Sequence, residues 1–154
     1  MNKEQMINEL NTSLEKEFYH WHLYTHAAFL TTGLHREEYK EFFLEEAKGE
    51  AEHIQQFSNL IIGLGGTPIK KFSFEMPIAN EQEITNELLL QLALKMEEEV
   101  VQRYVHLMDR AEELEEYGGS NKIAGRYIHI FLEDQILDSR ATVDNIKQIL
   151  KNSF

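Results

Sequence analysis

The chain has 154 residues, a formal net charge of −12 and no cysteine. This length suits one compact domain over residues 1–154. The absence of cysteine excludes disulfides, zinc ribbons and cysteine-bound clusters, and the acidic surface disfavours nucleic acid and anionic membranes as partners. Only two prolines and eight glycines interrupt the sequence, which favours long helices.

The first part of the chain predicts two long helices. One is expected over about 3–32, with Asn2 and Gln5 as a capping box at its start and Gly33 just after its end. A second helix is expected over about 36–64, where "GLGGTP" ends it. Because the turn between them is short, the two helices form an antiparallel hairpin.

The second part predicts another hairpin. A third helix is expected from near Asn80 to Tyr117, with Asn80 and Glu83 in "NEQE" as a second capping box. "GGS" at 118–120 separates it from a fourth helix, expected over about 121–150. This second short turn again makes the pair antiparallel.

The segment 65–80 between the hairpins has a different character. It holds both prolines, shows no helical period and is long for a connector. It can therefore cross the full length of a bundle. Two hairpins joined by one long crossover predict an all-α, antiparallel four-helix bundle.

Each predicted helix carries a stripe that a bundle would bury, with residues spaced alternately three and four apart. The stripes are Leu10, Leu14, Glu17, Trp21, Tyr24 and Ala28 in the first helix, Phe43, Glu46, Glu50, His53, Phe57, Leu60 and Leu64 in the second, Leu90, Leu94, Glu97, Val101, Tyr104, Met108 and Ala111 in the third, and Ala124, Ile128, Phe131, Gln135, Asp138 and Thr142 in the fourth. Every stripe is largely apolar, and every one has polar groups near its middle. The polar residues expected to converge in one central layer are Glu17, Glu50, His53, Glu97, Gln135 and Asp138.

A buried layer of carboxylates needs a compensating charge, since a buried ionised group costs several kcal/mol unless it is paired. The stripes contain no lysine or arginine. Carboxylates with one imidazole and no thiolate suit iron or manganese, and also zinc. The pattern therefore predicts a dinuclear metal centre bridged by Glu50 and Glu97. The competing interpretation is that these residues are solvated or paired, on helix faces whose phase is misassigned.

Other polar residues of the first helix are alternative candidates for binding the metal or acting beside it. His20 lies one turn from Glu17, while His22 and His26 are four residues apart on a different face. Their spacing could hold a metal, but it favours a surface or a subunit interface. Tyr24 lies two turns from Glu17 on the same face. It is either a core tyrosine that needs a hydrogen bond or a hydroxyl beside the metal that could give an electron.

Over about residues 3–150 the chain resembles the ferritin superfamily, so the ferritin-like version of the four-helix bundle is expected. The resemblance rests on Glu17, on the E-x-x-H pair Glu50 and His53, on "LKME" ending at Glu97, and on "FLEDQILD" in the fourth helix. "LGGTP" after the second helix and "FLED" in the fourth are most similar to bacterioferritins.

The resemblance implies that Fe(II) binds the centre, that O2 or H2O2 oxidises it, and that ferric mineral is stored in a hollow homo-oligomer. The first iron would bind the glutamate of the first helix and the E-x-x-H pair. Glu50 and Glu97 would bridge the ions, and Gln135 and Asp138 would join Glu97 at the second. Tyr24 matches the tyrosine found beside the ferritin centre, which implies a part in the oxidation.

Three features depart from the bacterioferritin pattern. "QILD", Gln135 to Asp138, stands where bacterioferritins have a second E-x-x-H and non-haem bacterial ferritins have Q-x-x-E, so a weaker second iron site is expected. Ala51 takes the place of the haem methionine, which argues against haem. The chain ends at "KNSF" without the fifth helix typical of ferritin cages, so a smaller shell or a dimer stays open beside a 24-subunit shell.

Two other functions stay open. One is a di-metal oxidase or peroxidase of the rubrerythrin type without storage, although rubrerythrins usually add a cysteine-bound iron domain and this chain has no cysteine. The other is a structural or binding bundle with a degenerate metal centre, which Gln135 and Asp138 leave open. The helix pattern of Dps-type iron sites is not found.

The chain is expected to reside in the cytoplasm. Its apolar runs fall short of the ~20 residues that a membrane span needs. The N-terminal stretch "MNKEQMINEL" is polar from the start and lacks the apolar segment of a signal peptide. A lysine-rich tail that would indicate DNA binding is also missing.

Overall fold

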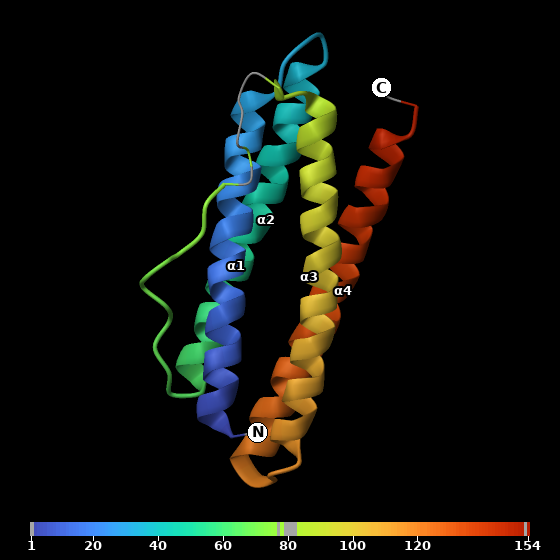
Figure 1. Cartoon of the computed structure of the whole chain (residues 1–154). Helices are drawn as coiled ribbons and strands as arrows, with labels where there is room; N and C mark the ends of the chain where they lie inside the picture. Colours follow the sequence, from blue (N-terminus) through green and yellow to red (C-terminus); the bar gives the residue numbers. More distant parts are fainter. Residues whose placement is uncertain (1, 77, 79–82, 153) are drawn as a thin grey trace.

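Four long α-helices make up the fold (Figure 1). The structure is a computed structural model that describes residues 2–76, 78, 83–152 and 154. The helices are α1 (Lys3–Leu30), α2 (Arg36–Gly63), α3 (Asn86–Glu115) and α4 (Gly119–Leu150). The described part of the chain contains no strand, so the predicted all-α four-helix bundle is confirmed.

The start of α1 confirms the predicted capping box. The Asn2 side chain accepts a hydrogen bond of 2.9 Å from the backbone N–H of Gln5, and the Gln5 side chain accepts one of 2.9 Å from the N–H of Asn2. The helix ends at Leu30, where the Thr31 hydroxyl donates to the carbonyl of Ala28. Gly33 lies in the following turn with φ +85°, which favours glycine.

Helix α3 begins later than predicted. The expected capping residue Asn80 lies outside the described residues, and the observed N-cap is Thr85, whose hydroxyl accepts from the N–H of Leu88. The Asn86 side chain forms two hydrogen bonds with the backbone of Thr32, of 2.9 and 2.7 Å. This contact with the turn after α1 fixes the helix start, and a local capping motif cannot reveal it.

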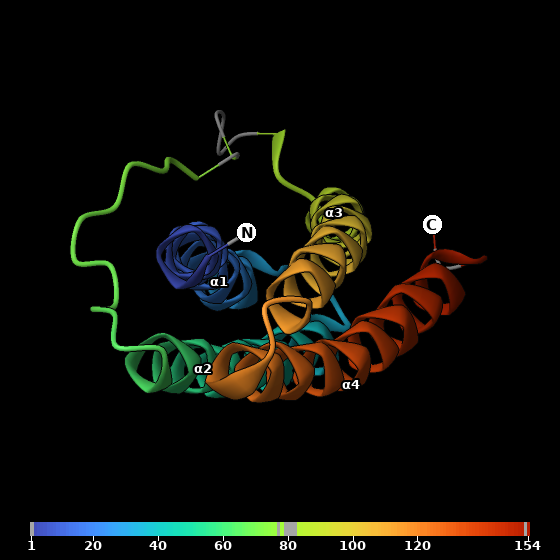
Figure 2. The same ribbon diagram turned by 90° about the horizontal axis from the view of Figure 1, so that it is seen from below.

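The two hairpins, α1–α2 and α3–α4, are joined by a crossover, and its described part follows the outer side of α1 (Figures 1 and 2). The Asn11 side chain holds this segment through the carbonyl of Thr67 and the N–H of Ile69, at 3.0 and 2.8 Å. Farther along, Phe72 packs on Phe18 with ring centroids 4.7 Å apart. The predicted long crossover is therefore confirmed, and it is anchored on the outer face of α1.

Two apolar clusters fill the bundle on either side of its middle. The buried members of the first are Met6, Leu10, Leu14, Phe57, Leu60, Ile61, Leu64, Val100, Tyr104, Leu107, Ala111, Leu114, Ile128 and Leu132. Those of the second are Leu23, Tyr24, Ala27, Ala28, Phe43, Ala47, Leu89, Leu90, Ala93, Met96 and Ile146. The stretch of each helix between the clusters carries buried polar side chains, so the predicted central polar layer exists.

Two residues of the predicted stripes are exposed. Trp21 is 36% exposed, and His20 is buried in its place. On α4, Asp138 is exposed and Ser139 is buried. Neighbouring residues on a helix lie about 100° apart, so a pattern of threes and fours fits two adjacent phases, and only packing distinguishes them.

Gly125 of α4 lies so close to α3 that a side chain has no room. A Cβ atom there would come within 2.6 Å of the Ala111 carbonyl oxygen and 2.8 Å of the Glu115 backbone nitrogen. Because these are backbone atoms, Gly125→Ala should destabilise the protein by ~1–3 kcal/mol. Gly49 in α2 meets nothing within 4 Å, so Gly49→Ala should stabilise it by ~0.5–1 kcal/mol. Urea unfolding at a fixed protein concentration measures both, and equal effects of the two substitutions would contradict this packing.

Candidate metal centre

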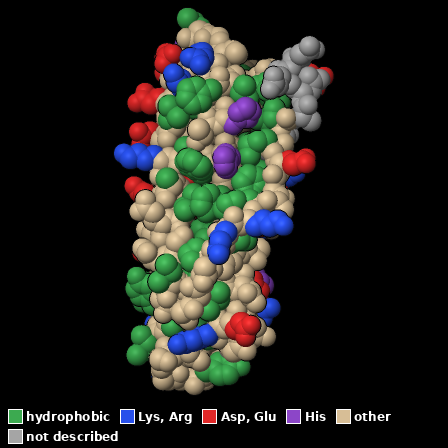
Figure 3. Space-filling model, turned by 90° about the vertical axis from the view of Figure 1, so that its left-hand side faces the viewer, with side chains coloured by type: hydrophobic (Ala, Val, Ile, Leu, Met, Phe, Trp, Pro, Cys, Tyr) green, Lys and Arg blue, Asp and Glu red, His purple; other side chains and the backbone are tan. Residues whose placement is uncertain are grey.

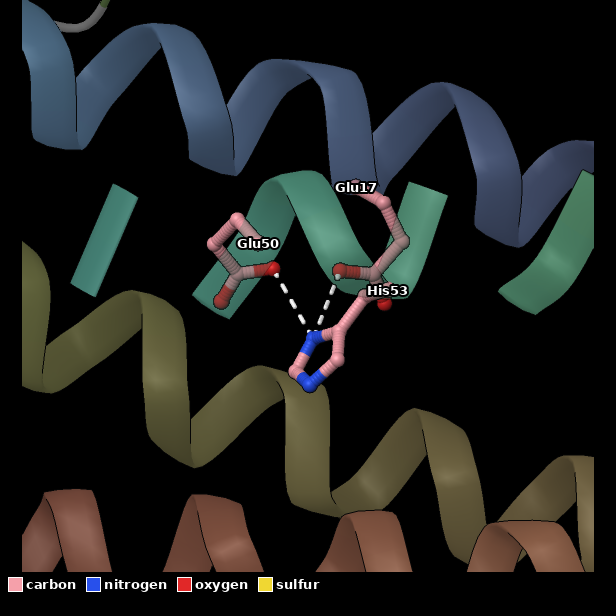
Figure 4. Close-up of side chains that lie close together, drawn as sticks. All are labelled: Glu17, Glu50 and His53. Atoms are coloured by element: carbon pink, nitrogen blue, oxygen red, sulfur yellow. Dashed lines mark hydrogen bonds and ion pairs between the residues drawn. The ribbon is translucent and has the colours of Figure 1, made fainter. Parts of the chain in front are cut away.

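Three side chains meet in the central layer: Glu17 from α1, and Glu50 and His53 from α2 (Figure 4). One oxygen or nitrogen atom of each lies within 4.8 Å of the other two. His53 Nδ1 is 3.2 Å from Glu50 Oε2 and 3.6 Å from Glu17 Oε2. Glu50 and His53 share a face of α2 because they are three residues apart. The arrangement can hold a metal ion.

His20 lies beside this cluster, although the sequence indicated it only as a competing histidine one turn from Glu17. The side chain is 6% exposed, and its Nδ1 lies 3.5 Å from Glu17 Oε2 and 3.9 Å from Glu50 Oε2. A signal for it does exist in the sequence. Glu17-x-x-His20 has the same spacing as Glu50-x-x-His53.

Two buried tyrosines hold carboxylates of the layer. Tyr24 of α1 donates a hydrogen bond of 2.6 Å to Glu97 of α3, and Tyr104 of α3 donates one to Glu17 of α1. Burial and the neighbouring carboxylates raise the pKa of both hydroxyls well above the ordinary value of 10.0, so both remain neutral donors. Tyr24 lies in the layer as the sequence suggested, and Tyr104 was not singled out.

The other predicted ligands divide into two groups. Glu97 and Gln135 are buried in the layer, and Gln135 Oε1 has no hydrogen-bond partner among the described residues. Asp138 points outward instead, because the buried face of α4 runs through Gln135 and Ser139. The structure therefore does not bring Asp138 into the cluster.

Protons balance the charge of the cluster. Burial raises the pKa of Glu17, but the polar contacts with Glu50 and both histidines outweigh it and hold that pKa well below its ordinary value. Burial and the charge of Glu17 raise the pKa of Glu50 well above its ordinary value. Burial alone would lower the pKa of His53, but the two carboxylates raise it to about 11. A metal ion must therefore displace protons from Glu50 and His53 in order to bind.

The outer face of α1 carries the other histidine pair. His22 and His26 are exposed, as the sequence predicts, and His22 lies 5.6 Å from the ring of Phe74 in the crossover. Figure 3 shows histidine side chains among apolar side chains on this side of the molecule. This pair is separate from the buried layer.

Comparison with protein families establishes the relationship. Residues 7–151 match the family model described as a ferritin-like domain. The chain belongs to the ferritin family. No curated protein sequence matches it.

Solved structures share the fold of this ferritin-like chain. A ferritin-like, diiron-carboxylate protein from Bacillus anthracis has 23% identity and a TM-score of 0.80, with 97% of each chain covered. A Dps protein from Bacillus brevis has 13% identity and a TM-score of 0.82, with the same coverage. A dodecameric thioferritin, the bacterioferritin-related protein from Bacteroides fragilis, has 20% identity and a TM-score of 0.67, covering 100% of this chain and 92% of that one.

Glu46 on α2 borders the layer and is expected to make stability depend on pH. Burial and the charge of Glu97 raise its pKa from 4.5 to about 7, although Thr142 donates to it at 3.4 Å. The protonated form is thus favoured more in the folded than in the unfolded state. This stabilisation is fully present below the unfolded pKa and is lost as the pH rises through the folded one.

Glu46→Gln keeps the shape of the side chain and cannot ionise. In metal-free protein it should raise the Tm at about pH 8, and the gain should shrink toward about pH 5, since the wild-type side chain is then protonated when folded. Differential scanning calorimetry at both pH values measures this. Glu45→Gln, on the exposed neighbour, is the matched control. A Tm difference that stays constant with pH would contradict the assignment.

Proposed function

We propose that this ferritin-like chain binds Fe(II) at the Glu17, Glu50 and His53 cluster and promotes its oxidation by O2 or H2O2, for iron storage or detoxification. The observation that carries the proposal is the cluster itself, since it lies at the centre of a bundle of the ferritin family. Two carboxylates with imidazole and no thiolate suit Fe(II), while Mn(II) and Zn(II) are possible substitutes. Iron here is the substrate, and it supplies the electron that the oxidant takes.

The chain's own residues have distinct parts in this proposal. Glu17, Glu50 and His53 bind the ion, while the tyrosine hydroxyls orient the carboxylates. Tyr104 holds Glu17, and Tyr24 holds Glu97. The two apolar clusters exclude bulk water from both ends of the layer, which strengthens charge interactions inside it.

A second ion is proposed between Glu50 and Glu97, with Gln135 beside it. This half of the layer has weaker donors, because Gln135 is a neutral amide and α4 places Ser139 inside. Asp138 as a ligand stays a prediction, and its exposed side chain would have to turn inward. We therefore expect one tightly and one weakly bound ion per chain.

Assembly and location are proposed with the function. A homo-oligomer is supported by the fold that the chain shares with a protein described as a dodecameric thioferritin. None of the described helices is both long and apolar enough to cross a membrane. Cytoplasmic residence and the absence of haem stay predictions.

Metal binding should stabilise the fold, because it removes the repulsion between buried carboxylates. At ~100-fold excess over the dissociation constant the gain in unfolding free energy is ~2.7 kcal/mol. Thermal melts of metal-free protein with Zn(II), or with Fe(II) under anaerobic conditions, measure this. The shift should largely disappear in Glu50→Ala and persist in the exposed Glu45→Gln. An unchanged Tm at saturating metal would remove the basis for the buried site.

Fe(II) oxidation should depend on the buried cluster. Glu50→Ala removes a ligand and a proposed bridge, so it should lower the initial rate by ~10-fold or more, at least the cost typical of losing a group that only orients a ligand. Asp138→Ala and Tyr24→Phe should have smaller effects, since they leave the tight ligands intact. Stopped-flow absorbance of ferric product measures the rates.

The exposed histidines provide the control for that measurement. His22→Ala and His26→Ala should leave the rate unchanged, because these side chains lie on the outer face of α1. If either slowed oxidation as much as Glu50→Ala, the reactive site would lie on that outer face and not in the central layer.

A further inference from the structure

We propose that His20 is a fourth ligand of the tightly bound metal, so that two E-x-x-H pairs, both on the α1–α2 hairpin, hold the ion. The pairs are Glu17 with His20 and Glu50 with His53. This inference rests on the proposed metal binding at the cluster and adds a ligand that the family resemblance does not include.

The positions of the four ligand atoms support a single ion between them. Both imidazole Nδ1 atoms face the same two oxygens, Oε2 of Glu17 and Oε2 of Glu50. The distances are 3.6 and 3.2 Å from His53, and 3.5 and 3.9 Å from His20. Ligands at ~2.0–2.1 Å from a tetrahedral ion are about 3.3–3.4 Å apart. Four of the six edges of such a tetrahedron are therefore present within about half an ångström. The group of atoms that all lie within 4.8 Å of one another contains Glu17, Glu50 and His53 but not His20, so the His20 ring has to turn toward the ion for both imidazoles to bind it.

Two buried polar atoms of the proposed site also lack the hydrogen bonds that they would normally form. Glu17 Oε2 and His20 Nδ1 are buried and have no hydrogen-bond partner among the described residues. Both side chains are more than nine-tenths buried, and buried polar atoms are normally paired. One metal ion bound by both atoms satisfies both at once.

A simple ion pair between His20 and Glu17 accounts for the geometry less well. A charged N–H···O hydrogen bond is ~2.7–2.9 Å long, whereas these atoms are 3.5 Å apart. His20 Nδ1 is also shared between two oxygens, one from each helix. These separations are compatible with two ligands of one ion, and the burial of both side chains distinguishes this pair from exposed His–Glu contacts of similar length such as His106 with Glu9.

The side chains that α4 contributes to the layer are consistent with a tight site formed by the α1–α2 hairpin alone. Helix α4 places Gln135 and Ser139 in the buried layer, so it supplies an amide and a hydroxyl. Its acidic neighbour Asp138 is exposed. The second E-x-x-H of this chain therefore lies on α1, and the tight site does not need α4.

Cobalt and zinc binding test the inference without measuring oxidation. Metal-free protein is titrated with Co(II), whose visible absorption reports ligand number, and Zn(II) affinity is measured by competition with a chromogenic chelator. His20→Ala should weaken binding of one ion per chain by at least ~10–100-fold, the cost typical of losing a group that only orients a ligand, and change the Co(II) spectrum, as His53→Ala should. His22→Ala, exposed on the same helix, should match wild type. Wild-type affinity and spectrum in His20→Ala would overturn the proposal.

A second measurement uses the wild-type protein and so does not depend on the folding of any variant. X-ray absorption at the zinc edge, with one equivalent of Zn(II) bound, should show two imidazoles, and a single imidazole would overturn the inference. If wild type binds neither metal, both this inference and the proposed function fail. If two imidazoles bind zinc but Fe(II) is not oxidised, only the proposed function fails.

Discussion

The structure depends on the burial of three carboxylates in the middle of an apolar bundle. Glu17, Glu50 and Glu97 are each at most 5% exposed, and apolar clusters close the layer at both ends. A buried carboxylate without a partner is costly, so the surrounding residues must supply donors or positive charge. The tyrosines and histidines of the layer are the residues that do so.

The tyrosines connect the two hairpins in a reciprocal way. Helix α1 gives Tyr24 to Glu97 of α3, and α3 gives Tyr104 to Glu17 of α1. Each helix therefore contributes one donor and one acceptor, which are seven residues, or about two turns, apart on both helices. Because each hydroxyl is fixed by packing, each carboxylate is oriented before a metal arrives, and such preorganisation is what a binding site requires.

Much of this arrangement was predictable from the sequence, and the failures have a common cause. Glu50 and His53 meet in the central layer as predicted, because residues one turn apart on a helix must share a face. Trp21 and Asp138 were misplaced because each has a neighbour, His20 or Ser139, that fits the same alternating pattern. The choice between adjacent phases depends on how the helices pack, which a single sequence does not encode locally.

The start of α3 failed for a different reason. Its position follows from hydrogen bonds between Asn86 and Thr32, residues that belong to different hairpins. Local capping rules compare only residues within one turn, so they cannot weigh such a contact. Propensity predicts that a helix exists, and tertiary contacts determine where it begins.

The location of the E-x-x-H pairs determines which part of the fold controls the metal. All four proposed ligand atoms come from α1 and α2, which are joined by a short turn and packed along their length. The tight site then requires only one hairpin to be correctly packed. Helix α3 contacts this site through Tyr104, which donates to Glu17, and it adds Glu97 to the layer. Helix α4 contributes neutral side chains, so its packing affects the second ion more than the first. In such a chain the first hairpin alone determines the binding of one ion. Whether a second ion binds beside it depends on how the second hairpin packs on the first.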